Sequence, residues 1–463
     1  MSELHFLGAA RTVTGSQYLL ENDGEQLLVD SGMFQGEKHL RTKNWAEPEF
    51  DPGAVRALVL THTHLDHIGR VPRLVKQGFC GPIYCTPPTL ELAGVLLKDA
   101  AHLQEEDAGY LNRKGLTKHA PALPLFDTAD VERALPLFEA VELHETVRVG
   151  RGFSFSYREA GHLLGAASVD LRVANGSRET RVVLSGDLGR YDAVLVKDPE
   201  PAPEADYLVV ESTYGNRDHP QLDVLAQLED ALRRTFDRGG VLLIPSFAVG
   251  RTQQMISLMD QLVTQGRMRP FPIHVDSPMA IEASRIHARF PEAQRQGLSW
   301  MLGRSLLHGK WVQLHRSRHE SEALNEMKGP AVILSSSGMM SGGRILHHLR
   351  VRLPKAENML LITGYQAVGT LGRALLDGRE VVRIHKGDVP VRAEISVLKG
   401  LSGHADSGEI LRWLQGVQRP RTVFLTHGEE EAALALQQKL VRERGFDVQV
   451  PKQGERVSLA ASR

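Results

Sequence analysis

The sequence has very little cysteine and no long apolar run. Only Cys80 and Cys85 occur among 463 residues, which excludes a disulfide framework and favours a reducing, cytoplasmic setting. The segment that they bound, CGPIYC, lacks a second cysteine pair to complete a zinc site, so two free thiols are expected. No apolar run reaches membrane-spanning length, and the start MSELHFLGAA lacks the features of a secretory signal. We therefore expect no association with a membrane.

Neither sign of charge dominates the chain. Lys and Arg number 55 and Asp and Glu number 56, which excludes a uniformly basic nucleic-acid-binding protein but allows a local basic patch. The proportions of hydrophobic and charged residues, 42% and 24%, are those of an ordinary globular protein. The length predicts two domains, or one domain that carries a large insert.

Short β-branched runs alternate with amphipathic stretches along most of the chain. This alternation predicts an α/β protein in which helices cover the sheets. A Pro- and acid-rich stretch, Lys197–Asp206, predicts a surface loop, and Thr89–Arg113 predicts a long helix. Five predicted strands matter for the chemistry: Leu27–Val29, Val55–Leu60, Phe153–Ala160, Val182–Ser185 and Val423–Thr426.

A dense group of potential metal ligands follows the apolar strand Val55–Leu60. The sequence THTHLDH at residues 61–67 holds three histidines and an aspartate. On an extended backbone His62 and His64 share a side and can reach one ion, while Asp66 and His67 come from the start of the next helix. Imidazole and carboxylate ligands suit zinc, and this spacing suits two adjacent ions with two of these side chains each.

Further ligands are expected where other strands end. His162, Asp187 and His427 each stand at the end of a predicted strand, next to a glycine that allows close backbone approach. Asp30 ends the Leu27–Val29 strand in the same way and is expected to orient a metal-bound histidine. Ligands in open α/β sheets gather at the carboxyl ends of strands, which supports the grouping.

These residues resemble the metallo-β-lactamase superfamily, in which HxHxDH, a later His, a later Asp and a final His bind two zinc ions. The chain also resembles the β-CASP group of nucleases through three further segments: Val210–Gly215 (VESTYG), Leu401–Asp406 (LSGHAD) and Leu425–Gly428 (LTHG). The resemblance implies an αβ/βα sandwich with an inserted α/β domain. The sandwich would span residues 1–212 and 395–463, and the insert residues 213–394.

The resemblance also implies roles for individual residues. One ion would be held by His62, His64 and His162, a second by Asp66, His67 and His427, and Asp187 would bridge them. Glu211 and His404 would form a pair beside the centre, with His404 as general acid. The implied cofactors are two Zn²⁺ ions, with Mn²⁺ as an alternative. A histidine at position 427 is typical of RNA-directed members, whereas DNA-directed members typically carry valine there.

The insert is expected to hold the substrate. The loop Ser335, Ser336, Ser337 and Gly338 resembles the family's phosphate-contacting loop, and small residues there can present backbone N–H groups to a phosphate. Segments containing Arg251 and Gln366 resemble others that line the family's cleft. Arg344 begins a stretch with a local excess of basic residues, for which phosphate binding and an ordinary solvated surface are equally good interpretations.

The expected activity is hydrolysis of single-stranded RNA by a water molecule activated between two metal ions. The compact layout resembles the bacterial relatives of the polyadenylation-factor nuclease and favours endonucleolytic cleavage. Cleavage from the 5′ end, a DNA substrate and a small-molecule substrate such as a lactone remain alternatives. A catalytically silent RNA-binding scaffold is opposed by the complete ligand set. The sequence leaves the oligomeric state open, a homodimer included.

Overall fold

A computed structural model describes residues 2–119, 121–176, 178–295, 311–367, 369–385 and 387–460. The chain divides into two compact units. The first comprises Met1–Ala193, Lys197–Asp218 and Gly403–Arg463, and the second Val194–Val196 and His219–Ser402. The domain borders predicted from the sequence stay a prediction. None of the helices in the described ranges is both long enough and apolar enough to cross a membrane.

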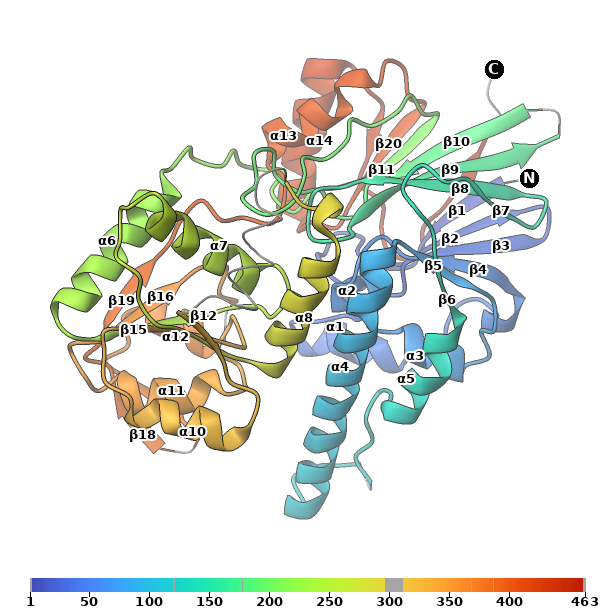
Figure 1. Cartoon of the computed structure of the whole chain (residues 1–463). Coiled ribbons are helices and arrows are strands. Elements are labelled where there is room, and N and C mark those ends of the chain that lie inside the picture. The colour runs from blue at the N-terminus through green and yellow to red at the C-terminus, as the bar shows by residue number, and fades with distance from the viewer. Residues whose placement is uncertain are drawn as a thin grey trace. The chain divides into compact units, whose positions relative to one another are not determined.

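The first unit contains two seven-stranded sheets (Figure 1). The first sheet has the order β22-β1-β2-β3-β4-β5-β6 and the second the order β21-β20-β11-β10-β9-β8-β7. The strands of the first sheet are β1 (Ser2–Phe6), β2 (Tyr18–Asn22), β3 (Glu25–Val29), β4 (Val55–Val59), β5 (Ile83–Cys85), β6 (Phe138–Ala140) and β22 (Arg456–Leu459). Those of the second are β7 (Val147–Val149), β8 (Phe153–Glu159), β9 (Ala167–Asn175), β10 (Arg178–Leu184), β11 (Tyr207–Glu211), β20 (Thr422–Thr426) and β21 (Val448–Gln449).

The two sheets share one hydrophobic core. Phe6 and Val29 of the first sheet belong to the same buried cluster as Phe155, Val182 and Phe424 of the second. A further cluster joins the outer face of the first sheet to its helices, and another does so for the second sheet. The unit's helices are α1 (Lys38–Thr42), α2 (Leu65–Ile68), α3 (Val71–Lys76), α4 (Pro87–Lys114), α5 (Thr128–Ala134), α13 (Ser407–Trp413) and α14 (Glu430–Arg444). The predicted αβ/βα sandwich is confirmed.

The second unit is a parallel α/β domain. Its six-stranded sheet has the order β14-β13-β15-β12-β16-β19, and every pairing is parallel. The strands are β12 (Val241–Pro245), β13 (Ile273–Asp276), β14 (Val312–Leu314), β15 (Ala331–Ser335), β16 (Met359–Ile362) and β19 (Glu394–Val397), with a separate hairpin of β17 (Val381–Ile384) and β18 (Gly387–Pro390). The helices are α6 (Val224–Asp237), α7 (Arg251–Thr264), α8 (Pro278–Arg289), α10 (Arg318–Glu326), α11 (Ile345–Arg352) and α12 (Leu371–Leu376). Core clusters on both faces of the sheet confirm the α/β class of the insert.

Candidate metal centre

The histidine-rich loop directly follows the buried strand β4. Residues 60–64 have no regular structure, and α2 begins at Leu65 with His64 as its N-cap. The loop packs tightly on the segment after β3, where Ser31 N donates to His67 O at 2.8 Å. A Cβ on Gly32 would lie 1.7 Å from Asp66 O, so this contact requires glycine. The backbone therefore fixes the direction in which the loop's side chains point.

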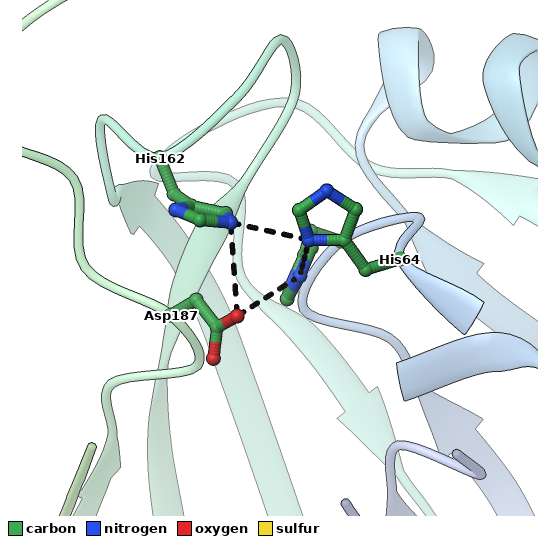
Figure 2. Close-up of side chains that lie close together, drawn as sticks. His64, His162 and Asp187 are labelled. Carbon is green, nitrogen blue, oxygen red and sulfur yellow. Dashed lines mark hydrogen bonds and ion pairs between the residues drawn. The ribbon is translucent and has the colours of Figure 1, made fainter. Parts of the chain in front are cut away.

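The first ligand group joins this loop to the ends of β8 and β10. Ligand atoms of His62, His64, His162 and Asp187 all lie within 4.8 Å of one another. His64 Nδ1 lies 3.1 Å from His62 Nε2 and 3.2 Å from His162 Nε2, and the labelled side chains converge in Figure 2. Asp187 Oδ2 lies 3.4 Å from His62 Nε2 and 3.7 Å from His162 Nε2. Four potential ligands thus converge on one small volume.

The second group lies on the other side of Asp187. Ligand atoms of Asp66, His67 and His427 lie within 4.8 Å of one another, with His427 Nε2 at 3.5 Å from Asp66 Oδ2. Asp187 Oδ1 lies 3.2 Å from His67 Nε2 and 3.3 Å from His427 Nδ1. Asp187 therefore presents one oxygen to each group.

The surroundings of the Asp187 carboxylate favour a bound cation. Its side chain is 1% exposed, and neither carboxylate oxygen has a hydrogen bond within the described part of the chain. A buried ionised carboxylate without such partners is costly. Burial alone would raise the pKa of Asp187, but His427, His67 and His62 hold it well below its ordinary value. Burial and the neighbouring His67 lower the pKa of His62 to about 3, so that ring stays neutral and able to bind metal. The donor set therefore fits divalent metal ions.

Two buried residues hold His67 in place. Its Nδ1 lies 2.7 Å from Asp30 Oδ2, so Nδ1–H donates to that carboxylate and Nε2 faces the second group. Asp30 also accepts from Thr61 N at 2.8 Å and from Thr61 Oγ1 at 2.9 Å. Asp30 was predicted from the sequence, whereas Thr61 was not, although its place directly before His62 was an available signal.

A backbone carbonyl fixes His162 in a similar way. His162 Nδ1 donates to Gly403 O at 2.8 Å, which turns Nε2 toward the first group. Gly403 precedes His404, so the segment that carries His404 also orients a potential ligand. Thr213 supports the second group, with Oγ1 at 3.2 Å from His427 Nδ1. Neither Gly403 nor Thr213 was singled out from the sequence.

Glu211 and His404 form the expected pair. His404 Nδ1 lies 3.2 Å from both carboxylate oxygens of Glu211. Glu211 is buried at the end of β11, and its Oε1 also accepts from Leu188 N at 2.6 Å. Burial would lower the pKa of His404, but the Glu211 carboxylate outweighs it and raises the pKa to about 9. His404 Nδ1 is 4.0 Å from Asp187 Oδ2, so the pair lies beside the two groups.

The predicted substrate-binding residues all belong to the second unit. Ser335 ends β15, and Ser336, Ser337 and Gly338 follow it as a loop. Gln366 is buried after β16 and donates to Gly338 O at 3.0 Å, which ties two of these loops together.

Two arginines complete that predicted set. Arg344 donates to Asp276 Oδ1 at 2.7 Å, and Arg251 at the start of α7 donates to Gln254 Oε1 at 2.6 Å. The binding roles of the whole set stay predictions.

Fold and site together define a class of protein, the hydrolases that act through bound divalent metal ions. Residues 10–233 match the metallo-β-lactamase superfamily, residues 252–375 the Beta-Casp domain and residues 388–451 the Zn-dependent metallo-hydrolase RNA specificity domain. The chain belongs to the β-CASP group of the metallo-β-lactamase superfamily. The resemblance inferred from the sequence, and the assignment as a metal-dependent hydrolase, are confirmed.

Several curated proteins are similar over nearly the whole chain. Ribonuclease TTHA0252 of Thermus thermophilus is 40% identical over 97% of this chain and 98% of its own length. Transcription termination factor FttA of Methanosarcina mazei is 30% identical over 93% of this chain and 67% of its own. An RNase J-like protein of Methanocaldococcus jannaschii is 26% identical over 97% of this chain and 98% of its own. A crystal structure of a protein of unknown function from Enterococcus faecalis shares the fold, with a TM-score of 0.57 at 13% identity over 98% of this chain and 99% of that one.

Proposed function

We propose that this protein is a zinc-dependent ribonuclease that cleaves phosphodiester bonds within single-stranded RNA. One observation carries the proposal: buried Asp187 faces a histidine group with each oxygen, and the Glu211–His404 pair lies beside it. The name of the Thermus relative and the match to an RNA specificity domain support an RNA substrate. The histidine at position 427 supports it too, through the family pattern. A cytoplasmic location and a homodimer remain predictions.

The seven ligands divide between two ions in this proposal. His62, His64 and His162 would hold one ion, Asp66, His67 and His427 would hold the other, and Asp187 would offer an oxygen to each. Zinc suits this mixture of imidazole and carboxylate, with Mn²⁺ as the alternative. Divalent ions held by these residues would supply a nucleophile from water near neutral pH and would offset the charge of the phosphate.

The protein's own side chains then have separate tasks. Asp30 and the carbonyl of Gly403 orient His67 and His162 through their Nδ1 atoms. His404 faces Glu211 with Nδ1, which leaves Nε2 to deliver a proton to the leaving 3′-oxygen. As the bond between phosphorus and water oxygen forms, the bond to the 3′-oxygen breaks. The products are a 5′-phosphate and a 3′-hydroxyl.

A panel of matched substrates tests this proposal. Purified protein loaded with zinc should cleave a circular single-stranded RNA as well as linear 5′-phosphate and 5′-hydroxyl RNAs of the same sequence, because an endonuclease needs no free end. Gel analysis of internally labelled RNA reads out the cleavage. An intact circle beside degraded linear RNA would reject the endonucleolytic mode, and hydrolysis of a lactone with every RNA intact would reject the nuclease proposal itself.

Two exposed aromatic residues of the second unit suit the bases of a single strand. Phe247 follows β12 and Tyr365 follows β16, which pair in parallel, so both lie at the carboxyl end of one sheet. Tyr365 is 69% exposed and Phe247 46%, which is unusual for such large apolar rings. Phe247 lies against Gly338, which belongs to the loop of Ser336, Ser337 and Gly338 after β15. A Cβ built on Gly338 would lie 3.1 Å from the Phe247 ring. Bases stacked on these rings would place the strand beside a loop suited to phosphate.

Replacing Tyr365 with alanine should therefore weaken binding of single-stranded RNA by about 1–3 kcal/mol, the range for one base stacked on one ring. Fluorescence anisotropy with protein that a chelator has stripped of metal measures RNA binding without cleavage. The matched control is Tyr110→Ala, which removes an exposed tyrosine from α4 in the other unit. The Tyr365→Ala effect should vanish with an abasic oligonucleotide, and an equal effect on both ligands would contradict stacking.

A further inference from the structure

A second cluster of potential metal ligands lies on the first two strands, outside the centre described above. Glu3 and His5 are on β1 and Glu21 is on β2. Their ligand atoms lie within 4.8 Å of one another. His5 Nε2 is 3.4 Å from Glu3 Oε2 and 3.3 Å from Glu21 Oε2. Leu4 and Phe6 point into the core between the sheets, so strand alternation puts this cluster on the opposite face of the sheet.

The Nε2 atom of the buried His5 imidazole lacks a hydrogen bond to any described residue. The side chain is 2% exposed, and Nε2 has no hydrogen-bond partner within the described ranges. Both carboxylates stand in front of that nitrogen, at more than 3.2 Å. Such spacing is long for a charge-assisted hydrogen bond, for which about 2.7–2.9 Å is typical. A bound ion or water between this buried nitrogen and the two acidic oxygens would satisfy all three groups.

Distances between histidine nitrogens and carboxylate oxygens elsewhere in this chain can be compared with those around His5. Where a histidine donates to a carboxylate, the atoms are 2.7 Å apart in His67 with Asp30 and in His348 with Asp276, and 3.2 Å apart in His404 with Glu211. Around the centre proposed to bind metal, the corresponding separations run from 3.2 Å for His67 with Asp187 to 3.7 Å for His162 with Asp187. The His5 cluster has the longer spacing. Ligands about 2.0–2.2 Å from a tetrahedral zinc ion stand about 3.3–3.6 Å from one another.

The strand register brings two like charges together at the same place. Glu3 and Glu21 are directly opposite in the antiparallel pairing of β1 and β2, an arrangement that destabilises a sheet. Gln26 of β3 donates to Glu21 Oε1, which leaves Oε2 for the cluster. Arg456 of β22 is opposite His5, yet among the described residues it forms no ion pair with either glutamate. A bound cation would offset this repulsion.

The geometry points to a binding site for one divalent transition-metal ion of the zinc type, held by His5 Nε2, Glu3 Oε2 and Glu21 Oε2. Imidazole with two carboxylates favours such an ion over calcium or magnesium, which prefer oxygen ligands alone. Both glutamates are about one-third exposed, so water can complete the coordination. The ion would link β1 to β2 and so reinforce the strand that also pairs with β22. This site is structural and does not depend on the proposed ribonuclease function.

Metal content of untagged full-length protein tests the site. Wild type and His5→Gln are stripped with chelator, loaded with zinc, freed of excess ion and measured by mass spectrometry. Wild type should hold one zinc more per chain than His5→Gln, whatever number the other centre holds. Because His5 is buried, Glu3→Gln and Glu21→Gln supply variants at partly exposed positions, and each should lose the same equivalent.

His102→Gln is the matched control. His102 Nε2 lies 3.4 Å from Glu106 Oε1, but both side chains are exposed, so water can satisfy the ring and the carboxylate. This variant should hold as much zinc as wild type. The melting temperature gives a second readout, since zinc should raise it further in wild type than in Glu21→Gln. Equal zinc content in wild type and the three cluster variants would overturn the site, as would equal zinc-dependent shifts in melting temperature.

Discussion

Replacing Asp187 with alanine should reduce metal binding and RNA cleavage together. Both of its oxygens face imidazole nitrogens, at 3.4 Å on one side and 3.2 Å on the other. Without the carboxylate, each proposed ion loses a ligand and the negative charge that offsets its own. We expect cleavage to fall by about 10³-fold or more, the upper end of what one electrostatic stabiliser supplies to a reacting centre. Zinc content should fall by at least one equivalent per chain.

The variant Asp170→Asn separates this effect from general damage to the sheet. Asp170 is also a buried aspartate of the second sheet, but it accepts from Arg181 Nε at 2.8 Å and contacts no ligand histidine. Its loss should reduce thermal stability and leave zinc content and the turnover of folded protein unchanged. Full zinc content and substantial cleavage in Asp187→Ala would contradict the bridging role.

The convergence of these potential ligands could be predicted from the sequence because their positions follow from strand geometry. Buried runs such as Val182–Ser185 predict where a strand ends, and parallel neighbours bring those ends to one edge. Asp187 and His427 could therefore be expected close together, although they are far apart in the chain. His62 follows β4 of the other sheet, so its place beside them depends on how the two sheets pack. The glycine beside Asp187 has a physical reason as well, because a Cβ on Gly186 would lie 2.8 Å from Thr61 Cβ.

Other contributions depend on contacts that leave no local pattern. Gly403 acts through its carbonyl oxygen, which any residue carries, so only the folded geometry shows that it orients His162. The pairing of β1 with β22 joins the two ends of the described chain, and no periodicity in either segment predicts it. Helices α8 and α10 were missed from the sequence. The like-charged pair of Glu3 and Glu21 has a meaning only once the strand register is known.

The Glu211–His404 pair gives the second prediction with a large effect, because it separates proton donation from metal binding. His404→Ala should keep wild-type zinc content, since the other ligand atoms converge without it. Its turnover should fall by about 10²–10⁴-fold, the usual contribution of a positioned general acid. Glu211→Gln should lower turnover less, because the ring keeps a hydrogen-bonding partner but loses the charge that raises its pKa to about 9. Loss of zinc in His404→Ala would assign the histidine to the metal site instead.

A substrate that needs no proton at the leaving group decides between acid catalysis and mere positioning. In RNA with sulfur in place of the bridging 3′-oxygen at one bond, the leaving thiolate is stable without protonation. Such a substrate should restore much of the turnover of His404→Ala relative to wild type. It should not restore that of Asp187→Ala, whose defect lies in metal binding and in the charge of the centre. If His404 only positioned the substrate, His404→Ala would lower the turnover of ordinary RNA and of the sulfur-containing RNA by the same factor. A selective recovery at the sulfur bond would place the proton of His404 on the leaving oxygen.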